Sequence, residues 1–345
     1  MSVRGAHVVV PDAIDDPRSV SGGNVYDRRL IDRLRAHGVD VHEAQVPVGD
    51  DLALRSALDR APAGSVVLID GLVASRAPGA VEGASRRREV VLLAHMVSAA
   101  LPSEDGDAVA GERRAVAAAH RVVATSPWTR DELVRRGLSD PAKVRVAVPG
   151  ADAADPSVGT RRGRGLLSVG VVSAHKGQDL LVAALAGLRD LGGWTCTMAG
   201  SLETDTAFAD AVVRATTTLG LADRVALPGV LAAPALSAAY RTADLVVAPS
   251  RVESWGIAVT DALRRGIPVV VSSAGGLPDA VATSRGAAVL VPPDDPDALQ
   301  GVLRRWMTDP RLRARARARA LATRRRLPTW DDTAARVASA LERMP

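Results

Sequence analysis

The sequence has few of the features that mark secreted, membrane-spanning or base-stacking proteins. Its single cysteine, Cys196, cannot form an internal disulfide. Arginine, aspartate, glycine or proline interrupts every apolar run before it reaches the roughly 18–20 residues that a membrane span needs, and the first residues lack the apolar core of a signal peptide. Aromatic residues make up 2% of the chain, too few for a platform that stacks single-stranded nucleic acid. These absences predict a soluble, cytoplasmic protein.

Length and charge further restrict the class of protein that the sequence can encode. The chain of 345 residues predicts two domains, and its 47% hydrophobic content can bury a sizeable core. Lysine and arginine exceed aspartate and glutamate by 44 to 39, and much of the arginine lies at 86–88, 161–164 and 311–326. In the last segment arginine occupies every second position, which we expect to scatter charge around a helix and so favours a solvated surface. An anionic membrane, an acidic acceptor and nucleic acid are the alternatives for this segment.

Short apolar runs alternate with helical patterns, which is typical of parallel α/β sheets. The first half predicts strands at 6–10, 39–42, 65–69, 89–93, 121–124 and 144–148, and helices at 24–37, 111–119 and 129–136. The second half predicts strands at 166–169, 194–199, 225–227, 245–248, 269–271 and 288–291, and helices at 178–191, 206–219, 233–241, 257–265, 278–282 and 296–326. Residues 151–165 predict a linker, and a last helix at 329–343 could pack back on the first domain.

The densest polar pattern lies between residues 244 and 280. A buried strand ends at Pro249-Ser250, Glu253 follows, and Asp261 lies in the first turns of the next helix. In α/β sheets, ligands bind outside the carboxyl ends of strands and at helix N-termini. Because a carboxylate can accept a pair of sugar hydroxyls, Glu253 and Asp261 predict a sugar-binding cleft.

This segment resembles the retaining glycosyltransferases of the GT-B fold, of the family 4 type, whose E-x7-E signature reads Glu253 to Asp261 here. Further matching blocks lie in the expected order along almost the whole chain: Ser21-Gly22-Gly23, Asp70-Gly71, His95, ATSPWTRDELVRRGL, VRVAVPGAD, Lys176-Gly177, LADRVALPGV and LPTW. The resemblance implies an α/β protein with two Rossmann-like domains facing across a cleft. The acceptor domain would comprise residues 1–158 with a returning helix at 329–345, and the nucleotide-sugar donor domain residues 159–328.

The resemblance also implies a role for each matching residue. Glu253 would hold hydroxyls of the donor sugar, and Lys176 would neutralise its diphosphate. His95 would line the acceptor side near the anomeric carbon, and with Glu253 and Lys176 it forms the predicted catalytic set. Asp261 would accept from the ribose hydroxyls. The remaining donor contacts would come mainly from backbone groups of Gly22, Gly23, Gly229, Val230, Ser254, Trp255, Gly256 and Ile257.

Three departures from the family pattern stand out. Val171 replaces the arginine that usually follows the glycine of the phosphate loop, so His175 or Arg251 would have to supply that charge. Asp261 is one methylene shorter than the usual glutamate. The loop after His95 differs from that of close relatives, which leaves the acceptor open among small molecules, saccharides and lipids, with a membrane surface possible.

We expect no metal or other cofactor. Lys176, loop N–H groups and a helix N-terminus can stabilise a departing diphosphate without one. The strings Asp105-Gly106-Asp107 and Asp295-Pro296-Asp297 lie where aspartate commonly caps helices. The family precedent implies front-face substitution with a UDP- or GDP-sugar. A GT-B phosphorylase or epimerase and a basic nucleic-acid-binding protein are the alternatives, whereas a NAD-linked enzyme is disfavoured because G-x-G-x-x-G is absent.

Overall fold

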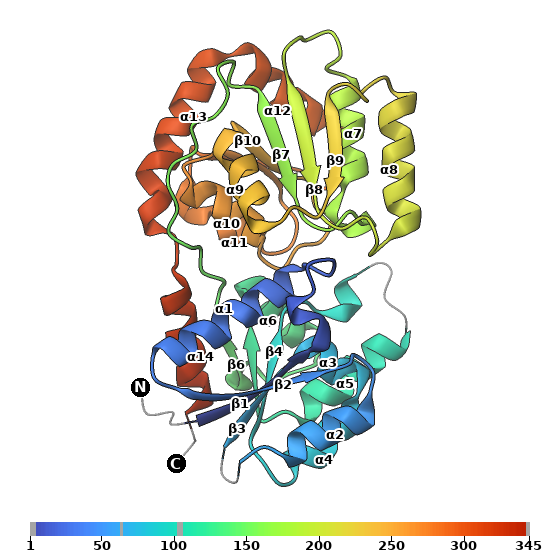
Figure 1. Cartoon of the computed structure of the whole chain (residues 1–345), viewed down its shortest axis with the longest axis vertical. Coiled ribbons are helices and arrows are strands. Elements are labelled where there is room, and N and C mark those ends of the chain that lie inside the picture. Colours follow the sequence, from blue (N-terminus) through green and yellow to red (C-terminus); the bar gives the residue numbers. More distant parts are fainter. Residues whose placement is uncertain (1–4, 63–64, 102–105, 343–345) are drawn as a thin grey trace. The chain divides into compact units, whose positions relative to one another are not determined.

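The computed structural model describes residues 5–62, 65–101 and 106–342 and divides the chain into two compact units (Figure 1). Unit 1 comprises residues 1–16, 22–150 and 328–345, and unit 2 comprises residues 17–21 and 151–327. Each unit is built on one six-stranded parallel sheet. Residues 151–164, between the two sheets in the sequence, carry no helix or strand.

The sheet of unit 1 has the strand order β2-β1-β3-β4-β5-β6. Its strands are β1 (Gly5–Pro11), β2 (Asp40–Val46), β3 (Val66–Asp70), β4 (Val90–Ala94), β5 (Arg121–Ala124) and β6 (Val144–Val146). Its helices are η1 (Asp12–Asp15), α1 (Gly22–Ala36), α2 (Asp51–Asp59), α3 (Gly71–Arg76), α4 (Pro78–Ser85), η2 (Ser98–Ala100), α5 (Gly106–Ala118), α6 (Pro127–Arg135), η3 (Pro141–Lys143) and α14 (Trp330–Leu341). Every residue of β3 and β4 is buried, because helices cover both faces of the sheet.

The last helix, α14, returns to unit 1 and packs against α1, as predicted. It begins with a capping box in which Thr329 and Asp332 satisfy each other's backbone N–H groups. The ring of Trp330 lies edge-on to Tyr26 of α1, with 5.6 Å between ring centroids. The hydroxyl of Tyr26 donates to the carbonyl of Ala147 at 2.9 Å. The final helix is therefore part of the core of unit 1.

The sheet of unit 2 has the order β12-β11-β10-β7-β8-β9. Read from the β9 edge, with β7 as strand 1, this order is 3-2-1-4-5-6, the Rossmann order. Its strands are β7 (Gly165–Val169), β8 (Thr195–Ala199), β9 (Val225–Gly229), β10 (Leu245–Ala248), β11 (Val269–Ser272) and β12 (Ala288–Val291). Its helices are η4 (Ala174–Lys176), α7 (Gln178–Ala186), α8 (Thr206–Thr218), α9 (Ala233–Thr242), α10 (Ile257–Arg264), α11 (Leu277–Val281), η5 (Ala282–Ser284), α12 (Pro296–Thr308), α13 (Pro310–Thr323) and η6 (Arg324–Arg326).

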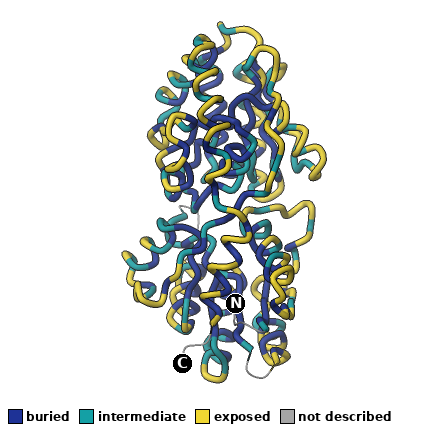
Figure 2. Tube along the Cα trace, turned by 90° about the vertical axis from the view of Figure 1, so that its left-hand side faces the viewer, coloured by how far each residue is buried: buried dark blue, intermediate teal, exposed yellow. Residues whose placement is uncertain are grey.

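Alternate residues of the central strand β10 enter two separate cores. Leu245 and Val247 of β10 pack in a cluster with Trp194. Val246, from the same strand, packs in a second cluster with Tyr240 and Leu263. This alternation places one core on each face of the sheet, and Figure 2 shows buried segments running through the middle of each unit. The predicted fold class, two Rossmann-like domains, is confirmed.

One helix prediction is wrong, and three helices have no prediction. The single helix expected over residues 296–326 is divided into α12, α13 and η6, because Asp309 caps a new helix whose first residue is Pro310. Helices α2, α3 and α4 were not predicted at all. Within the described ranges, none of the helices combines the length and apolar character that a membrane crossing requires.

Candidate active site

The strand order of unit 2 reverses between β7 and β10, which are hydrogen-bonded neighbours. In open α/β sheets this switch point, outside the carboxyl ends of the strands, is where ligands bind. Lys176 lies in η4, shortly after β7, and Glu253 lies in the loop after β10. The fold therefore brings two of the predicted site residues to one end of the sheet.

Lys176 and Glu253 form an ion pair. The distance from Lys176 Nζ to Glu253 Oε2 is 2.5 Å, and the two side chains are 22% and 12% exposed. Partial burial strengthens such a pair relative to one in open water. The ammonium group carries three donors and uses one here, so it can still donate to a negatively charged ligand.

Close backbone contacts hold both loops. Gly177 has φ +71°, and a Cβ atom there would lie 2.2 Å from the carbonyl oxygen of Pro249. Gly275 has φ +57°, and a Cβ atom there would lie 1.9 Å from the carbonyl oxygen of Glu253. The N–H of Gly276 donates to that same oxygen at 2.8 Å. The position of Glu253 thus depends on a glycine from the next strand-to-helix loop.

We expect Gly275→Ala to lower the free energy of unfolding by at least about 1–3 kcal/mol, because it combines a left-handed backbone with a clash against a carbonyl. Gly192→Ala is the matched control: an added Cβ there meets no atom within 4 Å, and its effect should stay within about 0.5 kcal/mol. Urea unfolding of both variants measures the difference. Equal stabilities would contradict this account of the loop.

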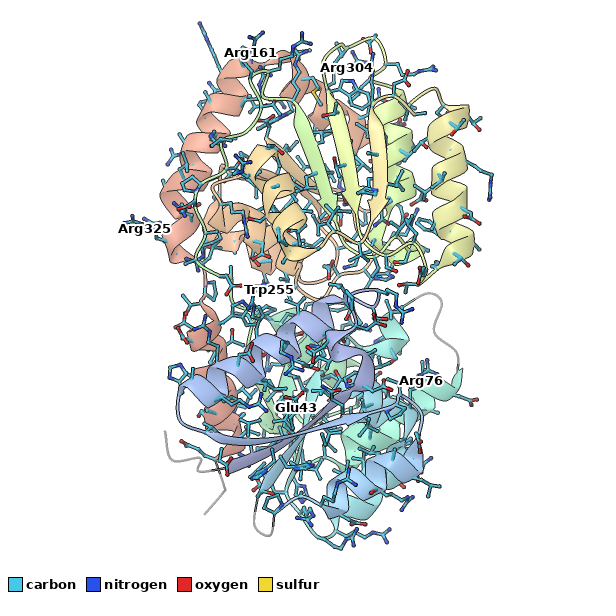
Figure 3. All side chains as sticks on the ribbon, in the orientation of Figure 1. Glu43, Arg76, Arg161, Trp255, Arg304 and Arg325 are labelled. Carbon is cyan, nitrogen blue, oxygen red and sulfur yellow. The ribbon has the colours of Figure 1, made fainter. Side chains whose placement is uncertain are left out.

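The turn after Glu253 leads into α10. Trp255 is 6% exposed, so its side chain is buried (Figure 3 labels it). Gly256 precedes the helix with φ +93°, and Ser254 and Ile257 are half-buried. The first N–H groups of a helix lack partners inside the helix, so this turn can receive an anion or hydroxyl oxygens.

Asp261 and the base-edge residues occupy other positions in unit 2. Asp261 lies on α10, with its Oδ1 atom 3.8 Å from Nη1 of Arg265. Gly229 ends β9, and its carbonyl accepts from the N–H of Gly200 at 2.9 Å. Val230 follows it directly. Their predicted contacts with ribose and base stay predictions.

The residues expected to replace the missing arginine are both engaged. Burial, together with the neighbouring Lys176 charge, lowers the pKa of His175 to about 4, so this imidazole is neutral at pH 7. Arg251 makes two hydrogen bonds to Asp179, at 2.9 and 2.8 Å, and one to Asp294 at 2.5 Å. Val171, at the expected arginine position, offers its carbonyl to the side chain of Gln178 at 2.9 Å. Lys176 therefore carries the positive charge of this loop.

Unit 1 gathers a second polar cluster at its own switch point, between β1 and β3. His95 follows β4, Asp70 ends β3, and Asp27 lies on α1. The Nε2 atom of His95 is 2.8 Å from Asp27 Oδ1 and 3.3 Å from Asp70 Oδ2. The sequence reasoning assigned no role to Asp27; its only signal is an acidic residue on the buried face of an amphipathic helix.

Burial governs the ionisation of this cluster. Asp27 is 1% exposed, and burial, against the opposing effect of His95, raises its pKa to about 6. Burial disfavours the charged form of His95, but Asp27 and Asp70 outweigh it and raise its pKa to about 10. At pH 7 the cluster therefore holds an imidazolium beside a carboxylate.

The three side chains are close enough to hold a metal ion, since their ligand atoms lie within 4.8 Å of one another. Hydrogen bonds already engage them: Asp70 Oδ1 caps α3 by accepting from Leu72 and Val73 at 2.8 and 3.0 Å. The contact of Asp27 with His95 has the length of an N–H···O bond. These contacts favour a shared proton at the cluster.

Gly22 and Gly23 form the first turn of α1, about one helical turn before Asp27. Of the two Asp-x-Asp strings, Asp295 caps α12 by accepting from the N–H of Ala298 at 2.8 Å, as predicted for a capping aspartate. Asp107 lies in the first turn of α5, whereas Asp105 lies outside the described residues.

Comparison with known proteins supports the same family. Residues 161–323 match the family model for glycosyl transferases group 1. The chain is 34% identical to a D-inositol 3-phosphate glycosyltransferase of Kineococcus radiotolerans over 232 residues, 60% of this chain and 53% of that one. It is 33% identical to D-inositol 3-phosphate glycosyltransferase 1 of Catenulispora acidiphila over 260 residues, 67% of this chain and 61% of that one. The matches span between about half and three fifths of these relatives' lengths.

Solved structures show the same fold. A sucrose-phosphate synthase from Thermosynechococcus elongatus superposes with a TM-score of 0.82 at 20% identity, covering 97% of this chain and 98% of that one. HepE from Anabaena, solved in complex with UDP and glucose, superposes with a TM-score of 0.79 at 18% identity, covering 99% and 100%. The chain thus has the GT-B fold, and its second half, residues 161–323, belongs to the glycosyl transferases group 1 family.

Proposed function

We propose that the chain transfers a glycosyl group from a nucleoside-diphosphate sugar, a UDP- or GDP-sugar, to a hydroxyl-bearing acceptor. The observation that carries the proposal is the Lys176–Glu253 pair at the switch point of the Rossmann sheet of unit 2. It joins a cation suited to a diphosphate with a carboxylate suited to sugar hydroxyls. Membership of the family and the UDP and glucose bound by the neighbour HepE support this donor class.

Departure of the nucleoside diphosphate is the step in which the protein must stabilise a growing negative charge. The bond between the anomeric carbon and the phosphate oxygen breaks, and negative charge grows on the phosphate. Lys176 donates to that phosphate while the first N–H groups of α10 face the developing charge, so the step needs no metal. The acceptor hydroxyl attacks from the same face, and its proton passes to the departing phosphate oxygen. The product keeps the anomeric configuration of the donor.

Glu253 holds the sugar while its partner Lys176 holds the phosphate. In the described structure Oε2 of Glu253 is engaged by Lys176, which leaves Oε1 to accept from sugar hydroxyls. Backbone N–H groups of residues 254–257 assist it. Asp261 accepts from the ribose, and Gly229 and Val230 contact the base.

In unit 1, His95 lines the acceptor side, with Asp27 and Asp70 holding its ring. As an imidazolium it donates to a hydroxyl or phosphate oxygen and does not act as the base, which fits proton transfer to the leaving phosphate. The relatives named D-inositol 3-phosphate glycosyltransferase support a small polyhydroxylated acceptor over a lipid.

A thermal-shift screen tests the donor class. UDP, GDP, ADP and TDP are each added with and without a sugar. One of these nucleotides is expected to stabilise the protein, raising the free energy of unfolding by about 2.7 kcal/mol at 100 times its Kd. Added EDTA should leave this shift and the transfer rate unchanged. If no nucleotide stabilises the protein, the proposal fails.

The anomeric configuration tests the mechanism separately. NMR of the product formed from the stabilising nucleotide sugar should show the anomer of the donor. An inverted product would contradict front-face substitution. Turnover of a sugar phosphate without any nucleotide sugar would instead support a phosphorylase.

A further inference from the structure

The arginine-rich helix α13 sorts its arginines into two rows. Arginine at every second position, from 311 to 319, falls alternately on opposite faces, because positions four apart share a face of a helix. Arg313 and Arg317 form a half-buried row, and Arg311, Arg315 and Arg319 form an exposed row. The arginines therefore lie on opposite faces of the helix and form no single stripe, and the exposed row is the solvated part.

The half-buried row has structural partners. Arg313 donates to the carbonyl of Trp306 at 2.6 Å, and Arg317 donates to that of Ser157. Arg324, in η6 just after the helix, donates to the carbonyl of Arg264 at 2.8 Å and to that of Ala154. These arginines tie α13 and η6 to the rest of unit 2.

The exposed row behaves differently at its C-terminal end. Arg319 lies on the rim of a surface pocket of about 300 Å³, which Arg285 and Arg326 also line. The three come from different segments: the turn after η5, the helix α13, and η6. Thr283 adds a hydroxyl, and none of the described residues that line the pocket is acidic. The three arginines that line this pocket thus have no carboxylate beside them among the described lining residues, whereas Arg251 and Arg304 are paired with aspartates.

None of the three pocket arginines has a side-chain hydrogen bond or ion pair to another residue in the described ranges. Like charges gathered without a partner repel one another, and an anion removes that cost. Guanidinium groups recognise phosphate oxygens through paired N–H donors, and a pocket of this volume accommodates a phosphate with part of its carrier. Figure 3 shows Arg325, the neighbour of Arg326 in the sequence, pointing away from the ribbon; it is exposed but does not line this pocket.

We propose that Arg285, Arg319 and Arg326, with Thr283, form a binding site for a phosphate monoester group on unit 2, separate from the Lys176–Glu253 site. The phosphate can belong to a soluble metabolite or to a lipid headgroup, since the same oxygens are recognised in both. The site does not depend on the proposed transfer reaction, because none of its residues takes part in that reaction.

Phosphate binding in a Lys176→Ala background tests this proposal, since that change removes the phosphate-binding cation of the proposed donor site. Isothermal titration with inorganic phosphate at low ionic strength is compared for two triple variants. The pocket variant is Arg285→Gln/Arg319→Gln/Arg326→Gln. The control is Arg214→Gln/Arg311→Gln/Arg315→Gln, which removes the same charge from exposed positions outside the pocket. We expect the Kd for phosphate to rise at least about ten-fold in the pocket variant and less than about two-fold in the control.

Sedimentation with phosphatidylcholine vesicles that contain phosphatidic acid separates the two sources of phosphate. If the pocket variant no longer binds these vesicles and the control variant still does, the phosphate belongs to a lipid headgroup. If inorganic phosphate binds and the vesicles do not, the ligand is soluble. If the pocket and control variants lose equal affinity for phosphate or vesicles, net charge alone explains the loss and the proposal is overturned. It is also overturned if Lys176→Ala alone abolishes phosphate binding, or if neither phosphate nor vesicles bind. If the triple variant fails to fold, Arg319→Gln against Arg315→Gln provides the same comparison.

Discussion

Lys176→Ala is expected to abolish stabilisation by a nucleoside diphosphate and to lower kcat about 100- to 1,000-fold, the usual effect of removing one electrostatic donor to a transition state. The change removes the only positive charge near the described phosphate loop that keeps two unused N–H donors beside the proposed sugar site, because Arg251 is engaged by Asp179 and Asp294 and His175 is neutral at pH 7. Thermal shift with the stabilising nucleotide and steady-state kinetics measure both effects.

Lys143→Ala is the matched control for this substitution. Lys143 and Lys176 are the two lysines of the chain, and Lys143 is an exposed residue of η3 in unit 1. Its loss should leave nucleotide stabilisation and kcat within about two-fold of the parent. A Lys176→Ala enzyme that still turns over at the parent rate would disprove the proposed role.

The two lysines stand against 42 arginines, the rest of the 44 basic residues. An ammonium is a compact charge with three donors on a flexible stem, whereas guanidinium is a planar fork. Lys176 uses this compactness to hold Glu253 at 2.5 Å while keeping donors for a phosphate. We therefore expect Lys176→Arg to recover part of the nucleotide binding and little of the rate.

Asp27→Asn is expected to change the pH dependence of stability. The pKa of His95 is raised to about 10 in the folded chain, above its ordinary value of 6.5. The resulting stabilisation is fully present below about pH 6.5 and is lost as the pH rises towards 10. Asp27, whose pKa is raised to about 6 from 3.8, adds a loss of stability as the pH rises from about 4 to 6. The folded parent should thus lose stability across both ranges.

Removing the Asp27 carboxylate removes a negative charge and a hydrogen bond that raise the pKa of His95. The free energy of unfolding of the parent should fall by about 1–3 kcal/mol between pH 7 and pH 9, and that of Asp27→Asn by much less. Urea unfolding at several pH values measures the slopes, and an NMR titration, assigned with His95→Gln, follows the imidazole directly. Asp12→Asn, an exposed carboxylate in unit 1, is the control. Identical slopes in parent and Asp27→Asn would show that Asp27 does not hold the proton.

Strands were more predictable than helices. The predicted strands at 121–124, 245–248 and 288–291 match β5, β10 and β12 residue for residue, because short β-branched runs between polar residues have few alternative structures. Helix α2 carried a signal that was missed: Asp50 caps it, and Leu54, Ala57 and Leu58 share its buried face. Helix α3 has six residues, too few to show a period.

The two polar clusters differ in how far the sequence could predict them. The family motif identified Lys176 and Glu253, and the fold brings them together across 77 positions. Asp27 and His95 are 68 positions apart, and Asp27 lies on a helix that carries one other aspartate and four arginines. Its place beside His95 depends on the β1–β3 switch point and on burial, which no local pattern encodes.

The return of α14 to unit 1 has a consequence for synthesis on the ribosome. Unit 2 lies within unit 1 in the sequence, because residues 151–327 separate the first sheet from its last helix. All six strands of unit 1 emerge first, yet Trp330 can reach Tyr26 only after the whole of unit 2 has been made. The half of the chain that is begun first is therefore completed last, against the usual order of domain by domain from the N-terminus. Until then the buried ring of Tyr26 lacks its neighbour, and a chain that ends before residue 330 contains all of unit 2 but an unfinished unit 1.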